Sequence, residues 1–298
     1  MNRPYVLLAL CFLPFAARAD LDVFACEPEW AALAVEIGDE HVDAESGTTA
    51  FQDPHYIQAR PSLIAEVRRA DLVVCSGAQL EIGWLPVLLR KASNRDVMPG
   101  NPGYLEASLF VRRLEPTSGV DRAQGDIHPM GNPHVQTNPH NVSLIARALS
   151  ERMAELDPQN AAAYRSGYED FKARFEQAIA QWEQRAAPLA GKRLIGHHKS
   201  WIYLEDWLGM KEVANLEPIP GLPPTAGHLS ELVSRYADGG ADAIIRAPFQ
   251  DARASEWLKE RTGIPAIVLP LTVGGSEGAT NLFTFYGDMI DRLLEATR

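Results

Sequence analysis

Short apolar runs that alternate with helical segments constrain the fold of this 298-residue chain most strongly. Residues 21–26 and 70–75 are two such runs, and residues 61–69 between them have helical periodicity. Runs that are apolar at nearly every position predict strands buried on both faces, as in parallel sheets covered by helices. We therefore expect an α/β fold, in which ligands bind at the carboxyl ends of the strands.

The same alternation starts again in the second half of the chain. It predicts three strands, over residues 192–196, 241–246 and 265–270, and two helices, over residues 200–208 and 282–297. An amphipathic helix over residues 141–156 closes the first half. Two halves built in this way predict two lobes, each with a parallel β-sheet flanked by helices.

A long helical segment separates the two halves. Asp157 as N-cap and Pro158 at the first helical position predict its start. The large apolar residues that follow recur at steps of three and four: Tyr164, Tyr168, Phe171, Phe175, Ile179 and Trp182. A helix of about 28 residues would be about 42 Å long. A rigid helix joining two lobes is expected, and one long core helix in a single domain is the alternative.

The expected organisation has four parts. Residues 1–19 combine a basic start, an apolar run and an Ala-Arg-Ala end, which predict a cleavable signal peptide and export to the periplasm. Residues 20–156 form an N-terminal lobe, residues 157–188 the long helix and residues 189–298 a C-terminal lobe. In an exported protein, the remaining pair Cys26 and Cys75 indicates either a disulfide or two buried thiols.

Three histidines stand near predicted strand ends or in loops of both halves. His55 follows Asp53-Pro54, His134 ends Gly131-Asn132-Pro133-His134, and His198 follows the strand 192–196. Three neutral imidazoles with one further ligand can complete a tetrahedral zinc site. The net charge of −11 is compatible with attracting cations and argues against a nucleic-acid partner.

At these residues the chain resembles the periplasmic metal-binding components of zinc and manganese ABC importers, the zinc-type solute-binding proteins of cluster A-I. The three histidine loops, the long helix and the stretches 217–224 and 269–275 carry the resemblance across nearly all of the mature chain. It implies that His55, His134 and His198 bind the metal between the lobes, with His197 as the alternative to His198. It also implies an inner-membrane permease and its ATPase as partners.

The fourth ligand is open, because the sequence departs from its relatives there. Many relatives carry an aspartate after the last strand, where this chain has Leu269-Pro270-Leu271, and Asn281 stands where an acidic residue is common. Water, Glu277 and Asn281 are the candidates. His128 and His140 flank the second histidine loop, and either provide a transient acceptor site for metal or are exposed.

A third imidazole favours Zn²⁺ or Cu²⁺ over Mn²⁺, whose sites are richer in carboxylates. The resemblance then favours Zn²⁺ as the transported ligand, with Mn²⁺ and Cu²⁺ as lesser candidates. We expect a monomer, with a periplasmic metallochaperone as a further partner. A periplasmic zinc-dependent hydrolase or hydratase with an open fourth position is the alternative function. No H-E-x-x-H, G-x-S-x-G or P-loop motif supports catalysis, so we expect no enzyme.

Overall fold

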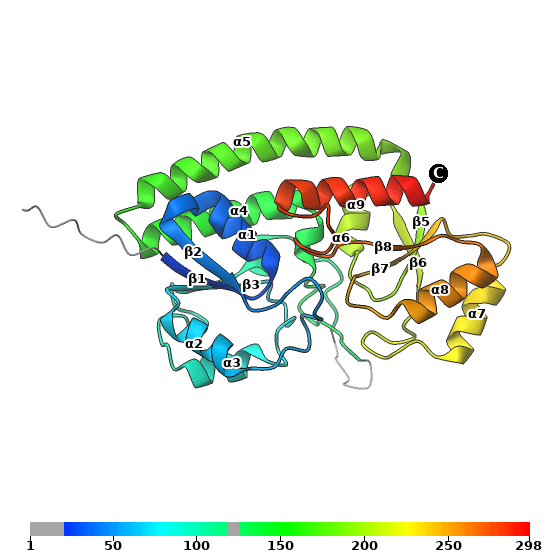
Figure 1. Cartoon of the computed structure of the whole chain (residues 1–298), viewed down its shortest axis with the longest axis horizontal. Coiled ribbons are helices and arrows are strands. Elements are labelled where there is room, and N and C mark those ends of the chain that lie inside the picture. The colour runs from blue at the N-terminus through cyan, green and yellow to red at the C-terminus, as the bar shows by residue number, and fades with distance from the viewer. Residues whose placement is uncertain (1–20, 119–124) are drawn as a thin grey trace, which may run out of the picture.

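The computed structural model describes residues 21–118 and 125–298. These residues form two four-stranded parallel sheets that lie side by side, with helices on the faces of each (Figure 1). The α/β fold with two sheets is therefore confirmed. The predicted signal peptide lies outside the described residues. Within the described ranges, no helix is long and apolar enough to span a bilayer.

The N-terminal sheet has the strand order β2-β1-β3-β4. Its strands are β1 (Leu21–Ala25), β2 (Val42–Ser46), β3 (Leu72–Cys75) and β4 (Tyr104–Glu106). Helices α2 (Pro61–Arg69) and α3 (Leu85–Ala92) cover the face that carries Phe24 and Val73. Helices α1 (Pro28–Gly38) and α4 (Pro139–Leu156) cover the opposite face, which carries Val23 and Val74. Alternate residues of each buried strand thus serve two separate cores.

The C-terminal sheet repeats this plan with the order β6-β5-β7-β8. Its strands are β5 (Arg193–Gly196), β6 (Lys211–Asn215), β7 (Ala243–Arg246) and β8 (Ala266–Val268). Helices α7 (Ala226–Tyr236) and α8 (Ala252–Thr262) pack on Ile195 and Ile244. Helices α6 (Ile202–Leu208) and α9 (Leu282–Ala296) belong to the core on the other face. In both sheets the first strand lies between the second and third, so a topological switch point lies beside it.

The long helix α5 (Ala161–Ala186) runs along both lobes (Figure 1). It starts at Ala161, so the prediction of Asp157 as its N-cap was wrong. Asp157 instead ends α4, where its backbone N–H donates to the carbonyl of Met153. The Asp157 carboxylate accepts a hydrogen bond from Tyr164 Oη at 2.8 Å, which ties the intervening turn to α5. With 26 residues, α5 is about 39 Å long.

Apolar side chains of α5 join the cores of the two lobes. Tyr164 is buried at the N-terminal end, and its hydroxyl donates to the carbonyl of His41 at 3.1 Å. Further along, the ring of Phe175 lies 5.8 Å from that of Tyr286 on α9, and the ring of Trp182 lies 5.0 Å from it. One buried cluster therefore includes residues of both sheets. Such a shared core resists a wide hinge motion between the lobes.

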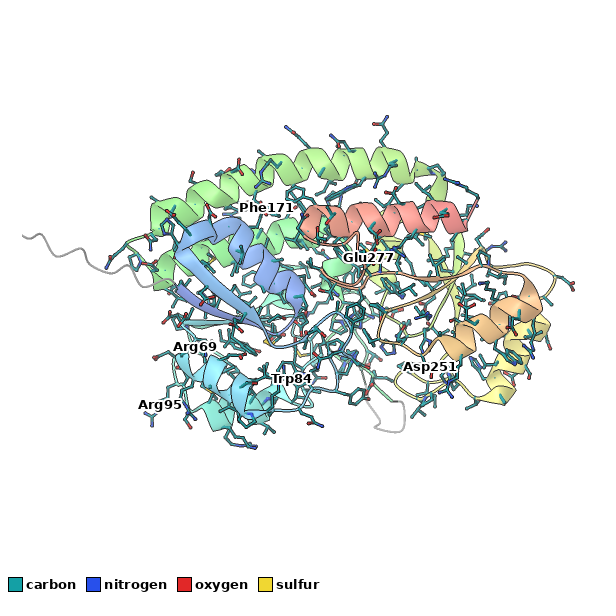
Figure 2. All side chains as sticks on the ribbon, viewed as in Figure 1. Arg69, Trp84, Arg95, Phe171, Asp251 and Glu277 are labelled. Carbon is teal, nitrogen blue, oxygen red and sulfur yellow. A yellow bond between two sulfur atoms is a disulfide. The ribbon has the colours of Figure 1, made fainter. Side chains whose placement is uncertain are left out.

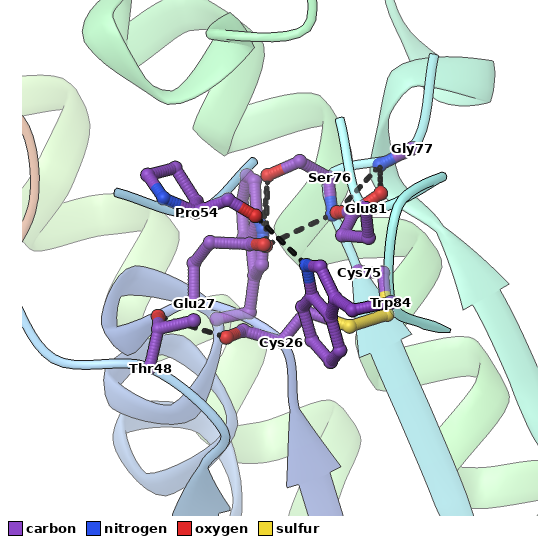
Figure 3. Close-up of a disulfide and its surroundings, with 10 residues drawn as sticks. Cys26, Glu27, Thr48, Pro54, Cys75, Ser76, Gly77, Glu81 and Trp84 are labelled. Atoms are coloured by element: carbon purple, nitrogen blue, oxygen red, sulfur yellow. Dashed lines mark hydrogen bonds between the residues drawn. A yellow bond between two sulfur atoms is a disulfide. The ribbon is translucent and has the colours of Figure 1, made fainter. Parts of the chain in front are cut away.

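A disulfide joins Cys26, which follows β1, to Cys75 at the end of the neighbouring strand β3 (Figure 3). The two Cα atoms are 4.8 Å apart across the carboxyl edge of the N-terminal sheet. Of the two states considered for this pair, the structure therefore has the bridge. It fixes the edge from which the first histidine loop departs.

Candidate metal centre

The imidazoles of His55, His134 and His198 lie together between the two lobes. Each offers one ring nitrogen to a group whose members are within 4.8 Å of one another. The ring centroid of His55 is 5.7 Å from that of His134 and 5.4 Å from that of His198. All three residues are buried, with exposed fractions of 9%, 1% and 7%. The structure thus brings together the three residues that the sequence singles out.

His55 is held by its own loop, between β2 and α2. The carboxylate of Asp53 accepts hydrogen bonds from the backbone N–H of His55 at 3.0 Å and from its Nδ1 at 2.7 Å. Pro54 stands between Asp53 and His55, and its carbonyl accepts a hydrogen bond from Trp84 Nε1 at 2.8 Å, which fixes this part of the loop (Figure 3). Burial acts to raise the pKa of Asp53, but the hydrogen bonds from His55 hold it below its ordinary value. An ionised Asp53 leaves His55 Nε2 as the nitrogen with a free lone pair.

His198 lies in the turn between β5 and α6. Its Nδ1 is 2.7 Å from the carboxylate of Glu217, which follows the adjacent strand β6. The same carboxylate oxygen accepts from the backbone N–H of Gly221 at 2.7 Å. A carboxylate behind a metal-binding imidazole fixes its tautomer and raises its basicity. His55 and His198 are therefore held in the same way, each with a carboxylate at Nδ1.

His197, the alternative to His198, has a different environment. Its backbone N–H donates to the carbonyl of Ile245, and its carbonyl accepts from Glu217, so it extends the ladder of β5. Its Nε2 lies 3.9 Å from Glu217. Burial lowers the pKa of His197, and Glu217 partly opposes this effect. In the described residues, His198 belongs to the cluster of ring nitrogens and His197 does not.

His134 is the most deeply buried of the three imidazoles. Its backbone N–H donates to the Asn132 side chain at 3.0 Å, just before a short 3-10 turn, Val135–Thr137. Among the described residues, neither of its ring nitrogens has a hydrogen-bond partner. Burial, followed by the neighbouring imidazoles, lowers its pKa well below the ordinary value. A buried polar group without a partner is costly unless a ligand satisfies it.

The candidates for the fourth ligand lie elsewhere. Glu277 is exposed and lies beside the start of α9 (Figure 2). Asn281 caps α9, and its side-chain oxygen accepts from the backbone N–H of Thr284 at 2.9 Å. His140 is exposed on the first turn of α4, with its Nε2 2.8 Å from Glu183. Glu277 and His140 do not belong to the histidine cluster, and the Asn281 side chain is engaged in the cap of α9.

Two nearby carboxylates, Asp53 and Glu217, had no assigned role in the sequence analysis, and His128 was considered only as a transient acceptor site or an exposed residue. Asp53 stands two residues before His55, and this short spacing was a usable signal. Glu217 is 19 residues from His198, and only the pairing of β5 with β6 brings them together. His128 Nε2 lies 3.3 Å from His55 Nε2, although a long loop separates the chain segments. Burial, followed by the charge of His55, lowers the pKa of His128 to about 4, so it is neutral at pH 7.

A cavity of about 380 Å³ adjoins the cluster. The residues that line it include Glu115, Asp126, His128, His198 and Lys199. Lys199 and Glu115 form an ion pair at 2.7 Å. The cavity therefore gives small polar solutes a path toward two of the imidazoles.

Two α/β lobes, a long connecting helix and a ligand cluster between the lobes define the class of two-lobed solute-binding proteins. Residues 23–296 match the family described as "Zinc-uptake complex component A periplasmic". The chain belongs to this family, the periplasmic metal-binding components of ABC importers, as the sequence resemblance indicated. Membership implies a membrane permease and an ATPase as partners.

Curated relatives agree with this placement. The chain is 25% identical over 232 residues to the high-affinity zinc uptake system protein ZnuA of Yersinia pestis, covering 72% of each chain. It is 20% identical over 263 residues to the metal ABC transporter substrate-binding lipoprotein SloC of Streptococcus mutans, covering 87% of this chain and 83% of that one. These relatives are substrate-binding proteins of transport systems and not enzymes, as expected for this chain.

Solved structures share the fold. A crystal structure of ZnuA superposes with a TM-score of 0.78 at 20% identity, covering 94% of this chain and 100% of that one. A Mn-bound periplasmic metal-binding protein from candidatus liberibacter asiaticus gives a TM-score of 0.74 at 14% identity, covering 93% and 99%. Proteins of this architecture thus include one solved with manganese.

Proposed function

We propose that this protein captures one Zn²⁺ ion with His55, His134 and His198 and delivers it to the permease of a zinc importer. The observation that carries the proposal is the convergence of three buried imidazoles from three separate loops. The carboxylates of Asp53 and Glu217 contact Nδ1 of His55 and His198, which fixes the orientation of both rings and raises their basicity toward a metal ion. The buried, unpaired ring nitrogens of His134 gain a partner when a cation binds.

The donor set supports zinc as the cargo. Imidazole nitrogen suits zinc, whereas manganese prefers oxygen ligands. Asp53 and Glu217 are acidic, but each is hydrogen-bonded to the Nδ1 of its histidine. In this arrangement the two carboxylates orient the histidine ligands and do not themselves bind the ion. Relatives named for zinc and for manganese both occur, so their names do not decide the metal. The choice of zinc therefore rests on the three imidazole donors of this chain.

Capture and release proceed through loop movements in this proposal. Hydrogen bonds cross between the lobes near the cluster: Tyr203 Oη donates to the carbonyl of Asn132 at 2.8 Å, and Asn132 Nδ2 donates to that of Lys199 at 2.7 Å. Thr272 Oγ1 donates to the buried carboxylate of Glu29 at 2.5 Å. These bonds and the shared core along α5 oppose wide domain closure. The monomeric state and delivery by a periplasmic metallochaperone stay predictions.

The metal content of the purified protein tests the proposal directly. Wild-type protein isolated from the periplasm should contain close to one zinc per chain. His198→Ala should lose most of it, and His140→Ala, which changes an exposed histidine outside the cluster, should retain it. Full zinc content and affinity in His198→Ala would overturn the assignment, and manganese in place of zinc in the wild type would overturn the choice of cargo.

A further inference from the structure

His128 is the nearest additional imidazole to the cluster, and nothing in the proposed three-histidine site uses it. Its Nε2 is 3.3 Å from His55 Nε2, and the two ring centroids are 5.3 Å apart. With zinc–nitrogen bonds of about 2.0–2.1 Å, two ligand nitrogens of a tetrahedral site are about 3.3–3.4 Å apart. The spacing between these two nitrogens thus matches one edge of a zinc tetrahedron. His128 lies outside the group of His55, His134 and His198 ring nitrogens that are within 4.8 Å of one another, so its ring must move closer to His134 and His198 when the cation binds.

We propose that His128 is the fourth protein ligand of the bound cation, so that four imidazoles surround it. This inference rests on the proposed zinc site. Because Asp53 accepts from His55 Nδ1, the lone pair of His55 Nε2 faces His128. Without metal, His128 Nε2–H donates to that lone pair. With metal, His128 carries its proton on Nδ1, and both Nε2 atoms bind the ion.

The backbone around His128 is held by both lobes. Asp126 accepts from Tyr56 Oη at 2.6 Å, next to His55, and its backbone N–H donates to the carbonyl of Pro220 at 2.9 Å. Gly125 has φ +79°, and a Cβ there would lie 2.1 Å from Pro220 O. This close approach requires glycine. The segment that carries His128 is therefore positioned between the loop of the first histidine and the loop after β6, which carries Glu217.

The cavity reaches only two of the four imidazoles. His128 and His198 line it, whereas His134 does not. A cation that leaves through this cavity breaks its bond to His128 on the way. The inference therefore predicts that removal of the His128 imidazole speeds release of the cation.

The other candidates for the fourth position are less well placed. The Asn281 carbonyl is used in the cap of α9, and Glu277 is exposed. Water remains the competing occupant. A fourth imidazole predicts a site without an exchangeable water, which also explains how the chain dispenses with an acidic ligand. The nature of the fourth ligand is therefore measurable.

The test compares purified metal-free wild type, His128→Gln and His140→Gln by zinc competition with a chromophoric chelator. His140 is the matched control, because it has the same side chain on the exposed surface of α4. We expect His128→Gln to bind zinc at least about tenfold more weakly, since loss of even an outer-shell partner costs about 10–100-fold. We expect faster transfer of zinc to the chelator as well. His140→Gln should behave as the wild type in both measurements.

X-ray absorption at the zinc edge counts the imidazoles. Four in the wild type and three in His128→Gln support the inference. Three imidazoles in both proteins, or unchanged affinity in His128→Gln, overturn it and assign the fourth position to water.

His198→Gln separates this outcome from failure of the proposed function. If His198→Gln loses zinc and His128→Gln does not, only the fourth ligand is wrong. If the wild type binds no zinc, both proposals fail. Thermal unfolding of each metal-free variant verifies folding.

Discussion

Glu217 provides a quantitative test of how the site holds His198. One carboxylate oxygen accepts from both His198 Nδ1 and the backbone N–H of Gly221 at 2.7 Å, and the side chain is 12% exposed. Glu217→Gln keeps an oxygen in that place and removes the charge. Hydrogen bonds to charged groups contribute about 1.5–3 kcal/mol. Because each 1.4 kcal/mol is tenfold in affinity, zinc binding should weaken by about 10–100-fold.

The assay is a zinc competition titration at fixed pH and ionic strength on metal-free protein. Glu217→Gln should fall at the lower end of that range, because both hydrogen bonds can persist. Glu217→Ala should fall at the upper end, because both bonds are lost. Glu277→Gln is the control, since Glu277 is an exposed glutamate of the same lobe and should bind zinc as the wild type does. An affinity for Glu217→Gln within twofold of wild type, or an equal loss in Glu277→Gln, would refute the reasoning.

The remaining predictions concern stability. Gly167→Ala should destabilise the protein by about 1–3 kcal/mol in chemical denaturation, although alanine favours helices, because the new Cβ would lie 2.1 Å from a carbonyl of α1. A gain in stability would contradict the close packing of α5. Replacing Cys26 and Cys75 with serine should lower the free energy of unfolding by about 4 kcal/mol, the loop-closure value for a separation of 49 residues. An unchanged denaturation midpoint in the double serine variant would contradict a stabilising role of the disulfide. Burial raises the pKa of Glu29 to about 7. Its stabilising contribution is present below the unfolded pKa near 4.5 and is lost as pH rises through about 7. Between pH 5 and 8 the metal-free wild type should therefore lose about 2–3 kcal/mol more stability than Glu29→Gln, and parallel pH profiles would disprove this.

The strands that could be predicted are the apolar ones: the central strands, which are largely buried, and the short apolar edge strand β8. Residues 21–25 and 72–75 are almost entirely apolar because helices cover both faces. The edge strands β2, β4 and β6 were missed. The sequences of β2 and β6, Val-Asp-Ala-Glu-Ser and Lys-Glu-Val-Ala-Asn, are polar because these strands are partly exposed. Without β6, the sequence offered no reason to place Glu217 beside His198.

Helix boundaries show a second limit of prediction from the sequence. Asp-Pro is a start signal for helices, yet here it lies in the turn between α4 and α5. The Asp157 side chain bonds to Tyr164, and tertiary packing therefore decided between two uses of the same local signal. Similarly, the helix predicted over residues 200–208 begins at Ile202, which leaves His198 in a turn four residues before it.

The site could be predicted in part. The Pro-His loops and the strand end identified three histidines, because the sequence itself places them at equivalent points of two halves. His128 could not be distinguished from His140, since both flank the same loop and both stand near proline. Their difference arises from contacts of the folded chain: the segment of His128 bonds to Tyr56 and Pro220, whereas His140 pairs with Glu183 on α5.

Anomalous diffraction at the zinc edge, from crystals grown with one equivalent of zinc, tests the central claim most directly. The account predicts a single anomalous peak at about 2.0–2.1 Å from a ring nitrogen of each of His55, His134 and His198. A peak placed away from these three imidazoles, or no peak under saturating zinc, would contradict it.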